Sequence, residues 1–425
     1  MEQWEQAIQQ KMNPPVPSEI ENRITRTLHR LPRQQRRRRT YYALPALVLA
    51  VVMLFGATAF SPALAETVRS IPVIGSIFEL VGNVGERKAG QDRLASPFGQ
   101  QAVIDGNTVT FTESLYDGTS IHIGYLNESG SHEFWPHVQV SIDGEPLMDY
   151  SSYSGGRTLA DGSFAGIHTI RSGQALPDAF TLELSSRDEP SWHVAIPMEV
   201  RGDEHVFLLN DARAWRDTTM VYDKLVFNAT STTLYVRWLT DEQGSNHPPV
   251  IHYQLFDDEG RVLQTFGNGA KGRPTEAGQY VFVSDFIYEP VEPLPQSLTI
   301  KPYVGSGSPT GTATGRWEGD SFELSQGEAG SLRIERVERK DHTYTMTYEV
   351  EGELTAQRTT HVWMENQHGA RYEVVRSPQR VEGTANRYQA AFASPNPDDD
   401  VIIGTAQFQP IDYLEDLIMT FTIAE

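Results

Sequence analysis

The chain has 425 residues, no cysteine and a formal net charge of −21. The length exceeds one ordinary domain, and the lack of cysteine excludes disulfides, thiolate zinc sites and cysteine nucleophiles. The acidic balance argues against a nucleic-acid partner, because nucleic-acid binding depends on basic contacts to phosphate. The charge is uneven, since residues 1–40 carry nine Lys and Arg against four Asp and Glu.

Residues 1–40 predict a basic cytoplasmic tail with an amphipathic helix. Ser18 and Glu21 form a capping box, so the helix begins at Glu19 and ends before Pro32. Its apolar side chains recur three or four residues apart on one face. This stripe, our candidate partner-binding surface, consists of Ile20, Ile24, Leu28 and Leu31. Two interpretations stay open: the stripe lies on the inner membrane leaflet, or it docks on a cytoplasmic protein.

Residues 41–60 predict one transmembrane helix. The run carries no charge, and as a helix it spans about 30 Å, the hydrocarbon thickness of a bilayer. Basic side chains precede it and place the N-terminus in the cytoplasm and residues 61–425 outside. The membrane-flanking residues are Arg36, Arg37, Arg38, Arg39, Tyr41 and Tyr42. A small-x-small pattern at residues 63–65 leaves cleavage open, although the long apolar run favours a retained anchor in the cell membrane.

Residues 61–100 predict a juxtamembrane helical segment. Its apolar positions follow a helical spacing that a proline and a glycine interrupt. The segment either rests on the outer membrane surface or packs beneath the first outer domain. The juxtamembrane motif comprises Ile71, Pro72, Ile74, Gly75, Ile77 and Phe78.

This motif, "SIPVIGSIFEL", is followed by "VTFTESLYDGTSIHIGYL". Together with the basic tail and single span, these stretches resemble single-span Gram-positive envelope proteins of the domain of unknown function 4179 family. Such proteins often carry an immunoglobulin-like domain of the 5643 type. The resemblance covers about residues 15–305. By association with extracytoplasmic-function sigma factors, it implies an anti-sigma or envelope-sensing role.

Residues 101–425 alternate apolar and polar residues at period two, which predicts β-strands. The stretches "SIHIGYL", "TLYVRWL" and "TYTMTYEV" occupy equivalent slots, and "ALPDAFTLEL", "PLPQSLTIKP" and "YLEDLIMTFTI" follow as late strands. The composition of residues 305–315 predicts a flexible linker. We therefore expect a mainly β chain with tandem immunoglobulin-like β-sandwich ectodomains at residues 101–205, 206–305 and 306–425.

Four stretches resemble functional or core signatures. In "HEFWPH" the two histidines stand five apart around a proline, which does not fit the zinc-protease spacing. Asp398, Asp399 and Asp400 are read as a solvated turn. "GNGAKG" is read as a hairpin turn, and Trp238 as a sandwich core residue. We expect no catalytic, cofactor-binding or metal-binding residues, and no enzyme activity.

The leading functional hypothesis is envelope sensing, or anti-sigma-like regulation of an extracytoplasmic-function sigma factor. The expected partners are membrane lipid, a cytoplasmic sigma factor and an envelope ligand. The alternative is an envelope adhesion or spacer protein with no signalling role.

Overall fold

The computed structural model describes residues 76–130, 134–159, 161–187, 191–216, 218–240, 251–275, 279–305, 308–393 and 400–423. The predicted tail, the predicted span and the motif residues Ile71, Pro72, Ile74 and Gly75 lie outside these ranges. Within them, no helix has both the length and the apolar character needed to cross a membrane.

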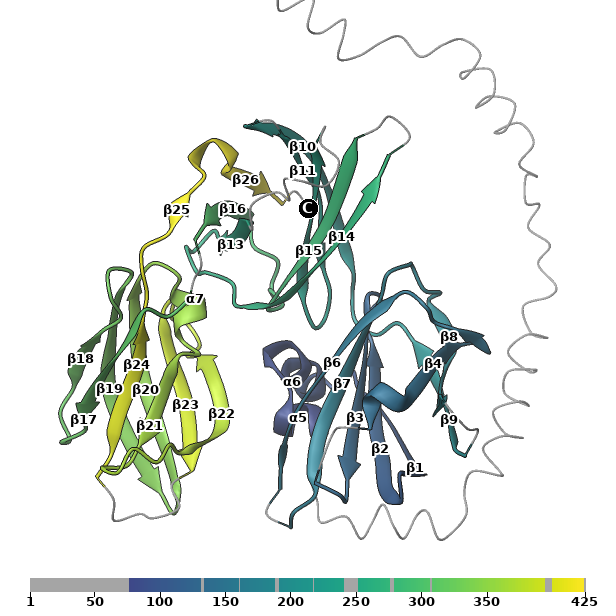
Figure 1. Cartoon of the computed structure of the whole chain (residues 1–425), viewed down its shortest axis with the longest axis horizontal. Helices are drawn as coiled ribbons and strands as arrows, with labels where there is room; N and C mark the ends of the chain where they lie inside the picture. Colours follow the sequence, from purple (N-terminus) through teal and green to yellow (C-terminus); the bar gives the residue numbers. More distant parts are fainter. Residues whose placement is uncertain are drawn as a thin grey trace, which may run out of the picture. The chain divides into compact units, whose positions relative to one another are not determined.

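The described residues are mainly β, as expected, and form several antiparallel sheets (Figure 1). The sheets combine in pairs, and each pair shares one hydrophobic core. We call these pairs the first, second and third sandwich. All three belong to one compact unit, Pro72–Glu425.

In the first sandwich the core lies between Phe111 and Ile123 of one sheet and Leu182 and Ile196 of the other. The larger sheet has the order β1 (Ser96–Ile104), β2 (Asn107–Tyr116), β3 (Ser120–Asn127), β7 (Phe164–Ser172) and β6 (Tyr150–Thr158). The smaller has the order β5 (Glu145–Pro146), β4 (Val138–Ile142), β8 (Ala179–Ser186) and β9 (His193–Glu199), and η1 (Trp135–His137) precedes β4.

In the second sandwich, Leu234, Val236 and Trp238 of one sheet pack with Leu255 and Ile300 of the other. Trp238 is 4% exposed, so its predicted core position is confirmed. The larger sheet has the order β10 (His205–Trp215), β11 (Thr218–Phe227), β12 (Thr232–Thr240), β15 (Tyr280–Tyr288) and β14 (Thr265–Pro274). The smaller contains β13 (Ile251–Asp257), β16 (Ser297–Val304), β25 (Asp412–Tyr413) and β26 (Met419–Thr422), and η2 (Glu415–Leu417) precedes β26.

The third sandwich packs Met346 and Tyr348 of one sheet against Met364 and Ile403 of the other. The larger sheet has the order β18 (Phe322–Ser325), β19 (Gly330–Lys340), β20 (Thr343–Gly352), β23 (Arg387–Ala393) and β22 (Glu373–Arg380). The smaller has the order β17 (Gly311–Arg316), β24 (Ile402–Gln407) and β21 (Val362–Glu365), and a short helix, α7 (Thr355–Arg358), follows β20.

The repeated stretches of the sequence occupy one position of the fold. "SIHIGYL" lies in β3, "TLYVRWL" in β12 and "TYTMTYEV" in β20, and each strand is third in its five-stranded sheet. These are the central strands, with neighbours on both sides. Their alternating side chains therefore reach the shared core, which explains why their periodicity is the clearest in the chain.

The C-terminal strands differ from the expectation that residues 306–425 form the third sandwich. The stretch "YLEDLIMTFTI" gives β25, η2 and β26, and both strands pair with β16 of the second sandwich (Figure 1). Leu417 and Met419 enter the second core. The strand equivalent to β8 and β16 in the third sandwich is instead β24, which pairs with β17.

Two glycine-rich stretches also differ from prediction. Residues 311–315, predicted as linker, lie in β17, and "GNGAKG" lies in the edge strand β14 rather than in a turn. Ring packing explains two of these glycines, because a Cβ on Gly272 would stand 2.7 Å from the Tyr280 ring and a Cβ on Gly315 would stand 2.4 Å from the Phe322 ring. Glycine here allows close packing rather than reversal of the chain.

The returning C-terminus predicts where a core mutation acts. Leu417 has no exposed surface, so Leu417→Ala should destabilise the second sandwich by about 2–5 kcal/mol. Native-state hydrogen exchange should show faster exchange at amides of β13 and β16 but not of β20 and β23. Glu415→Ala, an exposed change in the same 3-10 turn, is the matched control. Faster exchange confined to the third sandwich would contradict the pairing.

Candidate functional site

The short helix α5 (Ile77–Val81) is fixed to the first sandwich by its N-terminus. Glu113 of β2 accepts hydrogen bonds from the hydroxyl of Ser76 at 2.9 Å and from the backbone N–H of Phe78 at 3.0 Å. Burial raises the pKa of the Glu113 carboxyl despite these bonds. Phe78 has no exposed surface, and it packs with Leu115 and Ile167. The described end of the juxtamembrane motif therefore packs against the first sandwich.

The next helix, α6 (Val84–Gln91), lies against both the first and the second sandwich. Asn83 and Glu86 cap its N-terminus reciprocally, since each side chain accepts from the other's backbone N–H at 2.9 Å. Gly85 meets the β11–β12 hairpin of the second sandwich. A Cβ at this position would stand 1.9 Å from the carbonyl oxygen of Thr230, so only glycine allows this approach.

Glu86 also belongs to a buried hydrogen-bond network that links the helix to the first sandwich. Its Oε1 lies 3.1 Å from Nδ1 of His122 on β3 and accepts from the hydroxyl of Thr169 on β7 at 3.0 Å. Glu86 is 4% exposed and His122 is 3% exposed. The carboxylate is therefore bound at both oxygens, one by the helix cap and one by the sheet.

The other side of His122 faces the second sandwich. Its Nε2 lies 3.2 Å from the hydroxyl oxygen of Thr230, and that hydroxyl donates to Asp117. Asp117 also accepts from the backbone N–H of Ser120 at 2.7 Å. Because the only hydroxyl proton of Thr230 goes to Asp117, His122 Nε2 is the donor in its bond. The ring is thus joined to Glu86 through Nδ1 and, by way of the Thr230 hydroxyl, to Asp117 through Nε2.

The partners of Glu86 offset the cost of burying its carboxylate. Burial alone raises the pKa of Glu86, but the hydrogen bond and positive charge of His122, with the bonds from Asn83 and Thr169, lower it overall. The site excludes solvent, so the arrangement suits mechanical coupling of α6 to two sandwiches rather than chemistry on a substrate. We call the residues Asp117, Glu86, His122, Thr169 and Thr230 the α6 joint.

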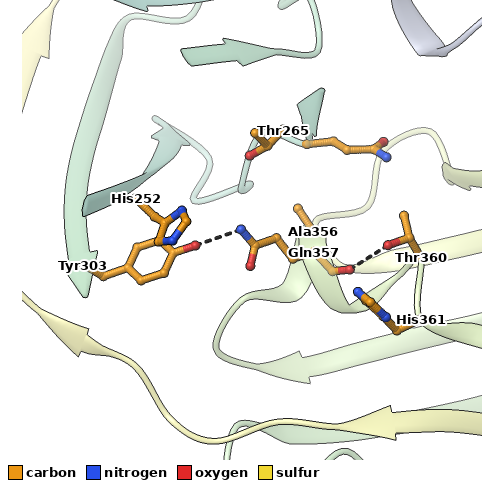
Figure 2. Close-up of a pocket in the computed structure, with 8 residues that line it drawn as sticks. His252, Thr265, Tyr303, Ala356, Gln357, Thr360 and His361 are labelled. Atoms are coloured by element: carbon orange, nitrogen blue, oxygen red, sulfur yellow. Dashed lines mark hydrogen bonds between the residues drawn. The ribbon is translucent and has the colours of Figure 1, made fainter. Parts of the chain in front are cut away.

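A second candidate is a small cavity of about 260 Å³ between the second and third sandwiches (Figure 2). His252 and Tyr303 line one side, and their rings stack at 5.2 Å. Gln357 of α7 reaches across and donates to the Tyr303 hydroxyl at 2.8 Å, as Figure 2 shows. His361 lies on the side of the third sandwich.

The chemistry of this cavity is neutral. Burial lowers the pKa of both His252 and His361, and burial raises that of Tyr303 to about 12 despite its bond from Gln357. At neutral pH all three side chains are therefore uncharged. Among the described residues that line it, none is charged. The cavity can offer hydrogen bonds and ring faces to a small neutral molecule, but it presents no activated nucleophile.

Comparison with protein families explains part of this architecture. Residues 35–129 match the model of a Domain of unknown function (DUF4179), and residues 204–326 match that of a Family of unknown function (DUF5643). The chain is therefore similar to the first family over residues 35–129 and to the second over residues 204–326. The DUF4179 match contains α5, α6 and the first three strands of the first sandwich. The DUF5643 match contains the second sandwich without its returning strands β25 and β26.

Solved structures show only distant similarity to this chain. The conserved domain protein from Bacillus anthracis is 13% identical, with a TM-score of 0.38 over 60% of this chain and 93% of that chain. The N-terminal eight Ig domains of Down Syndrome Cell Adhesion Molecule are 11% identical, with a TM-score of 0.15 over 78% of this chain and 42% of that chain. TM-scores this low support no argument about function. No curated protein matches the chain significantly.

The structure places only some of the sequence-predicted residues. Ile77 and Phe78 of the DUF4179 region lie in the core of the α5 contact. His137 is exposed beside the buried Trp135, and Asp400 forms an ion pair with Arg316. The tail stripe, the flanking arginines and tyrosines, and His132, Glu133, Asp398 and Asp399 lie outside the described residues. Within the described ranges, no group of three or more His, Asp or Glu could hold a metal ion.

Sequence reasoning missed the α6 joint. The local signal was present, because Asn83-Val84-Gly85-Glu86 is a capping-box pattern. The rest was not local: His122 lies on a strand that reads as apolar, and Thr230 stands 108 residues further on. A polar residue inside an apolar strand is the one sequence signal that could have singled out His122.

The lowered pKa of Glu86 gives the α6 joint a defined pH dependence. Its carboxylate contributes stability that is fully present above its ordinary pKa of 4.5 and is lost as pH falls through the lower folded-state pKa. Glu86→Gln should therefore destabilise the protein by about 3 kcal/mol at pH 7, because it leaves His122 without its charged partner. This difference should shrink below about pH 4.5.

Urea unfolding of both proteins across pH 3 to 7 measures this effect. Glu145→Gln, an exposed change on β5, is the control and should lack the pH-dependent difference. A Glu86→Gln penalty that stays constant down to about pH 3 would show that the carboxylate charge does not stabilise the joint.

Proposed function

We propose that the chain is a single-pass membrane protein whose β-sandwiches lie outside the cytoplasm and that it senses the state of the cell envelope. In this proposal the sandwiches meet an envelope ligand, and the tail helix holds or releases a sigma factor. The protein acts by binding and carries out no catalysis. The tail contact is the stripe of Ile20, Ile24, Leu28 and Leu31.

The α6 joint is the observation that carries the proposal. A sensor must transmit an event in its outer domains toward the membrane, and a flexible linker would absorb it. Here the helix pair that follows the predicted span is packed on the first sandwich and bonded, through His122, to Thr230 of the second. A displacement of either sandwich therefore reaches residue 76 through buried contacts.

A single span cannot easily carry a rigid-body signal, so the mechanism needs a further step at the membrane. Regulated cleavage or oligomerisation would supply it. The small-x-small pattern at residues 63–65 lies between the predicted span and the anchored helices. The position of the helices on the first sandwich would then control access to this stretch.

The second candidate is an envelope spacer or adhesion protein without signalling. It is supported by the way the units are joined, because the strands β25 and β26 return from the third sandwich to the second. This strand pairing would hold the second and third sandwiches together under load. The two candidates require different features of the tail. A sensor needs the apolar stripe that binds the partner, whereas a spacer needs only the basic residues of the tail.

Two substitutions in the tail of the full chain separate these candidates. The tagged membrane protein should copurify with an extracytoplasmic-function sigma factor, and the double variant Ile24→Ser with Leu28→Ser should lose this copurification. The apolar stripe is lost, while the membrane-flanking charges stay. Glu2→Gln with Glu5→Gln, which spare the stripe, should preserve recovery. If the unmodified chain recovers no sigma factor and its tail binds only anionic vesicles, the sensing proposal fails and the spacer stands.

The topology is tested on the same cells. Protease added to intact cells should digest residues 100–425 and spare the tail, because the basic flank stays in the cytoplasm. Digestion of the tail with protection of the sandwiches would contradict the orientation.

A further inference from the structure

A second, larger cavity lies where the first sandwich and its helices face the third sandwich. Its volume is about 530 Å³. Its walls come from the turn between α5 and α6, from β6, and from β19, β20 and β22. Four cationic side chains line it: Arg87, Arg157, Lys340 and Arg376. We call this space the basic cavity.

The lining of the basic cavity is positively charged, although the protein as a whole is negatively charged. The chain as a whole has a net charge of −21, yet only two acids, Glu79 and Asp341, line this cavity beside the four cations. Several arginines elsewhere in the third sandwich are paired with carboxylates, as Arg316 is with Asp400 and Arg387 with Glu335. Within the described part of the chain, none of the four cavity cations forms such an ion pair.

One guanidinium group of the cavity has a donor without a partner. Arg157 donates from Nη1 to the carbonyl oxygen of Val375 at 3.0 Å, while its Nε is buried and has no hydrogen-bond partner. Arg87 donates from Nη1 to the carbonyl oxygen of Gly82 at 2.8 Å and from Nη2 to the side-chain oxygen of Gln379 at 2.9 Å. None of these neutral acceptors balances a positive charge. A partly buried charge without a counter-charge is unfavourable, so a bound anion would stabilise this arrangement.

Two of the cations also repel each other. Burial lowers the pKa of Arg87, and the nearby charge of Arg376 lowers it further, while Glu86 opposes the shift. The guanidinium groups of Arg87 on α6 and Arg376 on β22 both line the cavity. This arrangement is typical of sites where an anion bridges the two cations.

We propose that the basic cavity binds a phosphate group. Planar guanidinium groups donate paired hydrogen bonds that match the oxygens of phosphate, and arginine predominates where such oxyanions are bound. The lining carries two more cations than anions, which suits a doubly charged ligand. The volume leaves room for an organic group on the phosphate. This site is independent of the sensing proposal, since it needs neither the tail nor a sigma factor.

The test uses the full chain in neutral detergent at constant ionic strength, so that salt screening does not change during the titration. Inorganic phosphate, glycerol 3-phosphate and glycerophosphoglycerol are titrated separately by calorimetry. A preference for either of the first two identifies a phosphate monoester or free phosphate, and a preference for the third identifies a phosphodiester such as a lipid headgroup. Binding of any one supports the site.

The decisive variant is Arg376→Gln. Arg376 is exposed and makes no hydrogen bond within the described structure, so its replacement should preserve the fold. It should weaken phosphate binding roughly tenfold, because a charged donor is lost. Arg273→Gln, an exposed arginine on β14 outside the cavity, is the matched control and should bind as the wild type does. No binding of the three probes up to about 10 mM, or equal binding by Arg376→Gln and the wild type, overturns the proposal.

Discussion

The carboxylate of Glu86 makes the contacts that join α6 to the first two sandwiches. It is almost fully buried, and a buried carboxylate is unfavourable unless both oxygens are bonded and a counter-charge is near. One oxygen caps α6, and the other meets His122 and Thr169 of the first sandwich. Through the opposite nitrogen of His122, the same charge is linked to Thr230 of the second sandwich. Helix α6, the larger sheet of the first sandwich and the β11–β12 hairpin of the second therefore each contribute hydrogen-bonding groups to this network.

A second constraint is the source of the strand that pairs with β8 in the first sandwich, with β16 in the second and with β24 in the third. In the first sandwich it is β9, which follows β8 in the chain. In the third it is β17, which comes before the rest of that sandwich, and in the second it is β26, from the C-terminus. The chain therefore passes from the second sandwich into the third and then returns to the second. A DUF5643 segment that stops near residue 326 leaves β16 without this neighbour.

The sequence predicted what depends on local periodicity. Buried and less buried side chains alternate over most of β12 and β20, and β3 is buried at nearly every position, so the mainly β character and the repeated slot follow from short windows. Strand partners are not local, and the alternation of "YLEDLIMTFTI" fits the second core as well as the third. Gly272 and Gly315 read as turn residues because the rings that require them lie on neighbouring strands. His122 was missed for the same reason, because its partners stand 36 and 108 residues away.

The central claim is that α6 is energetically coupled to the second sandwich through His122. Hydrogen exchange at the amides of α6 in a Thr230→Ala variant tests this most directly, because Thr230 belongs to the hairpin of the second sandwich and not to the helix. Loss of its hydroxyl removes the partner of His122 Nε2 and the bond to Asp117 Oδ2, and the account predicts exchange at residues 84–91 about tenfold faster. Unchanged exchange in α6, with faster exchange only in the hairpin, would contradict it.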